Sequence, residues 1–178
     1  MQVILDRLSL LFRARYPLVH LITHEEERVE RALEKLAGRE NMAVYRWRGT
    51  TGLSGPGGPV EGTEAFQAML GALSAVSVPA MFLCFDPHPY LSDPSSVRRL
   101  RDLAHAVGSR NQAVVLVGPE LRVPIELDKE LTVLDVPTNG IGIGGRFRRR
   151  ALAKCAHACT EAWTTSLISP PSDSPMLS

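Results

Sequence analysis

Short, uninterrupted apolar runs alternate with amphipathic stretches along most of the chain, and this alternation constrains the fold more than any other feature. The run AMFLCF at 80–85 is apolar at every position, which is typical of a strand buried on both faces of a sheet. Comparable runs lie near 18–22, 43–47, 113–118 and 131–136. Because helical patterns separate these runs, we predict an α/β fold with a five-stranded, mainly parallel sheet covered by helices on both faces.

The order of these strands can also be predicted. We expect the first strand to lie beside the last, with 80–85 and 113–118 near the centre, as in RecA-like domains.

Helix signals agree with this alternation. Apolar residues at helical spacing predict a first helix over about 2–15. The clearest helix follows Asp93, which is placed to cap it, and ends at Gly108. The glycine-rich segment GTTGLSGPGGPVEG, at 49–62, is predicted to be a long, mobile loop.

Composition limits the classes of protein that the chain can belong to. Apolar residues make up 44% of the 178 residues and charged residues 22%, so a packed core is feasible. A net charge of +1 gives no electrostatic footprint for nucleic acid, and three cysteines are too few for a disulfide framework. The sequence shows no signal peptide and no membrane-spanning run. We expect a cytoplasmic protein, or one of the plastid stroma if it is plastid-encoded.

The character of the chain changes after Pro137. From Thr138 onward, basic residues outnumber acidic ones by five to two, and the end is rich in Ser and Pro. We predict that 1–137 forms the domain and that 138–178 is a disordered or partly helical tail, basic at first and then Ser/Pro-rich. Two explanations of the tail stay open: a genuine basic extension, or the product of a shifted reading frame.

The junction VHLITHEEERVE, Val19 to Glu30, joins the first strand to the second helix. Thr23 and Glu26 have the spacing of a capping box, which places Glu25, Glu26 and Glu27 in the first helical turn. A phosphate at this position needs free backbone N–H groups and a cation, but three carboxylates compete with it and repel it. The junction is therefore interpreted as structural.

Asp86 is the one candidate for cofactor binding. It follows the apolar run 80–85, at the carboxyl end of a strand, where α/β sheets bind their ligands. Pro87 stands where an ATPase would carry the glutamate that activates water, and no G-x-x-x-x-G-K-[ST] phosphate loop occurs. We therefore expect no catalytic residue and interpret Asp86 as a loop residue. His88 is half of a metal site at most, so no metal is expected.

Other motifs carry less information. The run GIGIGG at Gly140–Gly145 lacks the lysine of a phosphate loop and the acidic partner of a dinucleotide site. Cys155, His157 and Cys159 do not share one helix face, so a metal site there is not expected. Arg98 and Asp102 have the spacing of an ion pair on a solvated helix face.

Several segments resemble one family in order and at similar spacing. They are LFRARYPLVHLITHEEERVERALEKLA at 11–37, TTGLSG at 50–55, VPAMFLCFDPHPYLSDPSSVRRLRDLA at 78–104 and VPIELDKELTVLDVP at 123–137. They resemble the amino-terminal region of the Ycf-type AAA ATPases of plastids and bacteria. The resemblance implies a degenerate RecA-like or P-loop-like three-layer domain that precedes an ATPase module. ATP and magnesium would belong to that module, and no catalytic residue carries over to this chain. The resemblance ends after 137, which is what a frameshifted or truncated copy would show.

The function expected is that of a non-catalytic amino-terminal domain for assembly or protein contact, truncated before the ATPase module. We expect no cofactor in this chain, and a protein partner or self-association rather than a membrane or nucleic acid. One alternative is an ATPase subunit that binds ATP weakly or completes its site with another chain. A second is a nucleic-acid binder that uses the basic tail, Arg146 to Arg150.

Overall fold

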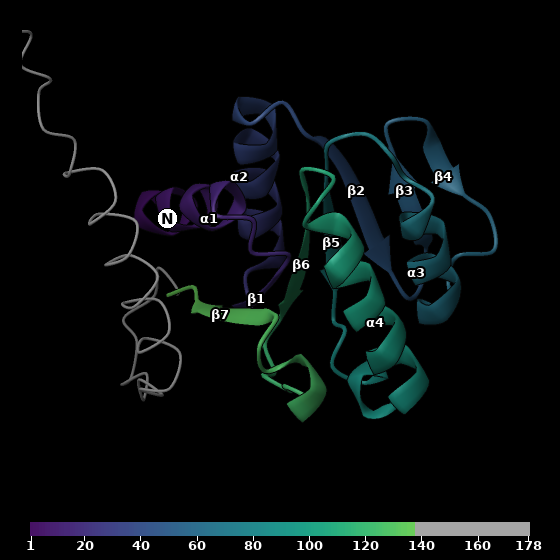
Figure 1. Cartoon of the computed structure of the whole chain (residues 1–178). Helices are drawn as coiled ribbons and strands as arrows, with labels where there is room; N and C mark the ends of the chain where they lie inside the picture. Colours follow the sequence, from purple (N-terminus) through teal and green to yellow (C-terminus); the bar gives the residue numbers. More distant parts are fainter. Residues whose placement is uncertain (138–178) are drawn as a thin grey trace, which may run out of the picture. The chain divides into compact units, whose positions relative to one another are not determined.

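The computed structural model describes residues 1–137, which form a mixed α/β domain built around one sheet (Figure 1). Its helices and strands follow in this order: α1 (Gln2–Arg13), β1 (Leu18–Ile22), α2 (Glu26–Arg39), β2 (Ala43–Arg48), β3 (Gly52–Gly55), β4 (Gly58–Val60), α3 (Phe66–Ser74), β5 (Ala80–Phe85), α4 (Pro94–Val107), β6 (Gln112–Gly118) and β7 (Leu131–Asp135). Two short 3₁₀ turns, η1 (Tyr90–Ser92) and η2 (Ile125–Leu127), follow β5 and β6.

The sheet has the strand order β4-β3-β2-β5-β6-β1-β7. The pairs β2–β5, β5–β6, β6–β1 and β1–β7 are all parallel. The first strand therefore lies beside the last, and β5 and β6 lie near the centre, which confirms the predicted order. The bounds of the five predicted strands differ from those observed by one residue at most.

Helices cover both faces of the sheet, and each face has its own hydrophobic core. Side chains from α1 and α2 pack with Met81, Leu83 and Phe85 of β5. Side chains from α3 and α4 pack on the opposite face with Phe82 and Cys84. Because successive strand residues point to opposite faces, a central strand needs apolar residues at every position. This requirement explains the unbroken run AMFLCF.

The glycine-rich segment is where the prediction was wrong. Instead of a loop, residues 52–60 form the antiparallel hairpin β3–β4, which extends the sheet from five strands to seven. Gly52 and Gly58 adopt positive φ angles of 70° and 99°, which glycine allows at no steric cost. Thr63 accepts a bond from the Leu53 N–H at 2.8 Å, and its carbonyl accepts one from the Trp47 indole at 2.7 Å. The glycines therefore shape a turn that these bonds fix in place.

Helix ends were predicted with mixed success. Asp93 caps α4 by accepting from the backbone N–H groups of Ser95 and Ser96, and the helix ends before Gly108, as expected. The first helix ends at Arg13, slightly earlier than expected. Predictions about the tail lie outside the described residues. No helix within residues 1–137 has the length and apolar character needed to span a membrane.

Candidate functional site at the carboxyl edge of the sheet

The carboxyl ends of β1, β5 and β6 meet at one edge of the sheet, where the chain leaves neighbouring strands in opposite directions. Two backbone bonds hold these ends together: the Thr23 N–H donates to the Gly118 carbonyl at 3.1 Å, and the Asp86 N–H donates to the Val117 carbonyl at 2.8 Å. In parallel α/β sheets, ligands bind at such a point. This edge is therefore the candidate position for a nucleotide or metal site.

The β1–α2 junction places carboxylates at the start of α2, but not through the predicted capping box. The helix begins at Glu26, with Glu25 as the N-cap residue. The Thr23 hydroxyl accepts from the Glu25 N–H at 3.0 Å, so it stabilises the turn before the helix instead of bonding within the first turn. Thr23 is buried beside the end of β6, which holds it two residues ahead of the N-cap. Glu26 and Glu27 lie in the first turn, as expected.

Asp86 lies at the carboxyl end of β5, as predicted, and is exposed. Its φ angle of 49° is in the left-handed region, which Asp tolerates better than most residues. The Asp86 carboxylate lies close enough to the carboxyl group of Glu26 for the two groups to interact electrostatically. The structure thus brings Asp86, at the end of β5, close to Glu26, at the start of the helix that follows β1.

Burial and the negative charge of Asp86 both raise the pKa of Glu26, while the charge of Arg48 opposes this rise. The neutral form of Glu26 is favoured, because an ionised Glu26 would be repelled by the nearby carboxylate. A phosphate approaching the start of α2 would meet the same repulsion.

The arginines near this edge are already paired. Arg48 donates to Glu30 at 2.7 Å, and its guanidinium lies 4.1 Å from the centre of the Phe85 ring. Arg46 bonds to the same Glu30 carboxylate at 2.8 Å and also to Glu34. These arginines form a charge network between β2 and α2. An anionic ligand would have to break that network to recruit either of them.

Two histidines lie on the other face of the sheet. His20 in the middle of β1 is fully buried, and neither of its ring nitrogens has a hydrogen-bond partner. Burial, and to a smaller extent the nearby His88, lowers the pKa of His20 to about 4. The Nε2 atom of His88 lies 3.9 Å from a carboxylate oxygen of Glu120.

Sequence analysis did not single out His20, although a polar residue inside the apolar run LVHLI was a visible signal. It did raise His88 as half of a metal site. Among residues 1–137, no three side chains of the metal-binding types gather closely enough to hold an ion.

The remaining sequence candidates include one ion pair in the described part of the chain. Arg98 and Asp102 form this expected pair on α4, at 3.1 Å. The other candidates lie outside the described residues: Gly140–Gly145, the cysteines and histidine of 155–159, and Arg146 to Arg150.

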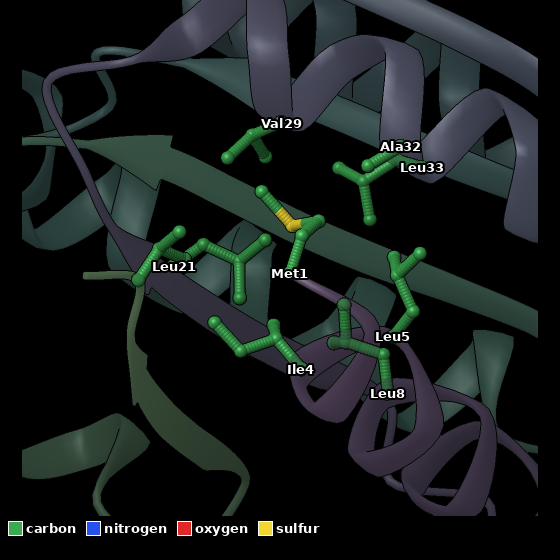
Figure 2. Close-up of a pocket in the computed structure, with 9 residues that line it drawn as sticks. Met1, Ile4, Leu5, Leu8, Leu21, Val29, Ala32 and Leu33 are labelled. Carbon is green, nitrogen blue, oxygen red and sulfur yellow. The ribbon is translucent and has the colours of Figure 1, made fainter. Parts of the chain in front are cut away.

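An apolar hollow lies between α1, α2 and β1, and Figure 2 shows the side chains that line it. Its lining includes Met1, Leu8, Leu21 and Leu33, with no charged or polar side chain. It has no room even for a water molecule. This hollow is a seam of the core rather than a site for chemistry.

Together, the fold and this edge define an α/β domain with a mostly parallel sheet and with carboxylates at the start of the helix that follows β1. Comparison with known proteins identifies the family. The model of the "SpoVK-like AAA ATPase, N-terminal domain" matches residues 4–136. The chain therefore belongs to the SpoVK-like AAA ATPase family through this N-terminal domain.

Two curated relatives agree with this assignment, and both carry the name "Uncharacterized AAA domain-containing protein ycf46". The relative from Guillardia theta is 32% identical over 135 residues, which cover 72% of this chain and 26% of the relative. The relative from Trieres chinensis is 30% identical, with 72% and 27% covered. The chain thus spans little more than a quarter of the length of these relatives. No solved structure is significantly similar to it.

Proposed function

We propose that residues 1–137 are a degenerate RecA-like domain that serves assembly or protein contact and does not itself bind or hydrolyse nucleotide. ATP and magnesium would then act in the part of the relatives that this chain does not span. The domain would contribute contacts to other protein surfaces, in the cytoplasm or the plastid stroma.

The contact between Glu26 and Asp86 is the observation that carries this proposal. In a nucleotide-binding domain of this topology, the start of the helix after the first strand offers its N–H groups and its positive dipole to phosphate. Here a carboxyl group from that helix start lies close to the carboxylate at the end of β5 and interacts with it. In this proposal, the protein's own carboxyl groups stand where a phosphate would have to bind.

The charge network supports the same interpretation. Phosphoryl transfer requires cations around the transferred group. Near this edge, Arg46 and Arg48 are bound to glutamates of α2. Pro87, which follows Asp86, cannot act as a base toward water.

Calorimetric titration of the full chain with Mg-ATP tests the proposal. We expect no heat of binding at micromolar nucleotide, in either the wild type or the variant Asp86→Ala. Micromolar binding that is lost on Asp86→Ala would instead show that the chain is a nucleotide-binding subunit with Asp86 in its site.

A further inference from the structure

One segment of the chain is almost free of charge. Between Gly49 and Phe85, only Glu61 and Glu64 are charged, although charged residues make up 22% of the chain. This segment forms the β3–β4 hairpin, α3 and β5. The solvent-facing sides of the other three helices all carry charges, for example Arg7, Arg31 and Arg98. Depletion of charge is typical of the centre of a protein interface.

The solvent side of α3 is made of small or uncharged residues. Ala68, Gly71 and Ser74 are exposed there. A Cβ atom added to Gly71 would meet nothing within 4 Å. Glycine inside a helix lowers its stability, and no contact within the domain requires a glycine at this position. The backbone of α3 is therefore open to close approach from outside.

A groove of about 230 Å³ runs between α3 and α4, which lie side by side in Figure 1. It is lined by Leu70, Gly71, Ser74, Arg99, Asp102 and Leu103. Its charged side chains are thus one arginine and one aspartate, both on α4. Asp102 already pairs with Arg98, but its side chain is still 56% exposed and can accept a second partner.

We infer that this groove, with the uncharged side of α3, is the surface through which two copies of the chain associate about a two-fold axis. This inference rests on the proposed function in assembly. The solvent-facing side chains of α3 bring no like charges together in such a contact, while Arg99 and Arg110 donate to the backbone carbonyls of Gln67 and Ser74 at its two ends. In a two-fold contact, Arg99 of each copy can face Asp102 of the other, so the groove is complementary to itself. Because α3 has only nine residues, the contact is small and we expect micromolar association.

Sedimentation velocity of the full chain over micromolar to submillimolar concentrations tests the inference. We expect a reversible monomer–dimer equilibrium in the wild type. Gly71→Arg should weaken dimerisation at least tenfold. It should not unfold the domain, because arginine favours helix more than glycine does and the space is open. Ala14→Arg is the matched control, since Ala14 is exposed at the end of α1, on the opposite face of the sheet.

A charge exchange makes the test specific to the pairing. Arg99→Asp and Asp102→Arg should each weaken self-association, because each variant brings like charges together across the axis. An equimolar mixture of these two variants should dimerise again, because both cross-axis pairs then have opposite charges.

The inference is wrong if the wild type is monomeric throughout, if Gly71→Arg dimerises like the wild type, or if mixing restores nothing. These results are distinct from failure of the proposed function, which only Mg-ATP binding would reveal.

Discussion

At the scale of the residue, His20 is the side chain whose surroundings have the clearest energetic consequence. It is buried without a partner for either ring nitrogen. A buried imidazole in this state resists protonation, because the charged form loses its solvation. His88 is the one titratable neighbour that lowers its pKa further.

This burial predicts a loss of stability at acidic pH. With a folded-state pKa of about 4 against an ordinary 6.5, the unfolded chain binds the proton more readily. The contribution of His20 is therefore complete above about pH 6.5 and is lost as the pH falls toward 4, by about 3 kcal/mol in all. The measurement is urea unfolding from pH 7.5 to 4.

His20→Leu should remove most of this pH dependence without loss of stability at pH 7.5, because leucine suits the apolar surroundings. His105→Leu, at an exposed position of α4, should keep the pH dependence of the wild type. A His20→Leu profile parallel to that of the wild type would contradict the account.

At the scale of the element, the β3–β4 hairpin depends on which glycines lie against other side chains. A methyl group at Gly55 would overlap the ring of Tyr45 on the neighbouring strand. At Gly57, in the turn, it would meet nothing within 4 Å. We predict that Gly55→Ala lowers the free energy of unfolding by about 1–3 kcal/mol, a typical cost of overpacking. Gly57→Ala should change it little.

Urea unfolding of the two variants against the wild type is the measurement. Equal midpoints for Gly55→Ala and Gly57→Ala would mean that the hairpin does not pack on Tyr45 as described.

The same hairpin shows where sequence analysis reaches its limit. The central strands could be predicted because burial on both faces requires apolar residues at every position, a pattern visible within six residues. The hairpin could not, because its order depends on Thr63, which lies outside the glycine-rich segment. Thr63 accepts from the Leu53 N–H and is itself held by the Trp47 indole. The glycines, considered without these bonds, indicate a loop.

The candidate site, too, could be predicted from the sequence only in part. The local sequence pattern was enough to predict the position of Asp86 at a strand end and the acidic start of α2. The contact between Glu26 and Asp86 could not be predicted, because 60 residues separate them in sequence and only the parallel pairing of the strands brings them together. His20 was missed because the free-energy cost of burying its imidazole depends on neighbours from other elements.

At the scale of the whole molecule, the domain boundary is still a prediction. Within residues 1–137, the two cores include residues as late in the chain as Leu131 and Val136. We therefore expect a chain that ends at Pro137 to fold and to unfold within a few degrees of the full chain, as followed by circular dichroism. A larger drop in the midpoint, or failure to fold, would place 138–178 within the domain and would argue against a frameshifted tail.

The central claim is that the protein's own carboxylates fill the position of a phosphate at the start of α2. Amide chemical shifts of residues 23–28, recorded by NMR during titration with Mg-ATP, test it most directly, because these N–H groups would bind the phosphate. We predict no saturable shift at micromolar nucleotide. Shifts of these amides that saturate in the micromolar range, and that disappear in Asp86→Ala, would contradict the claim.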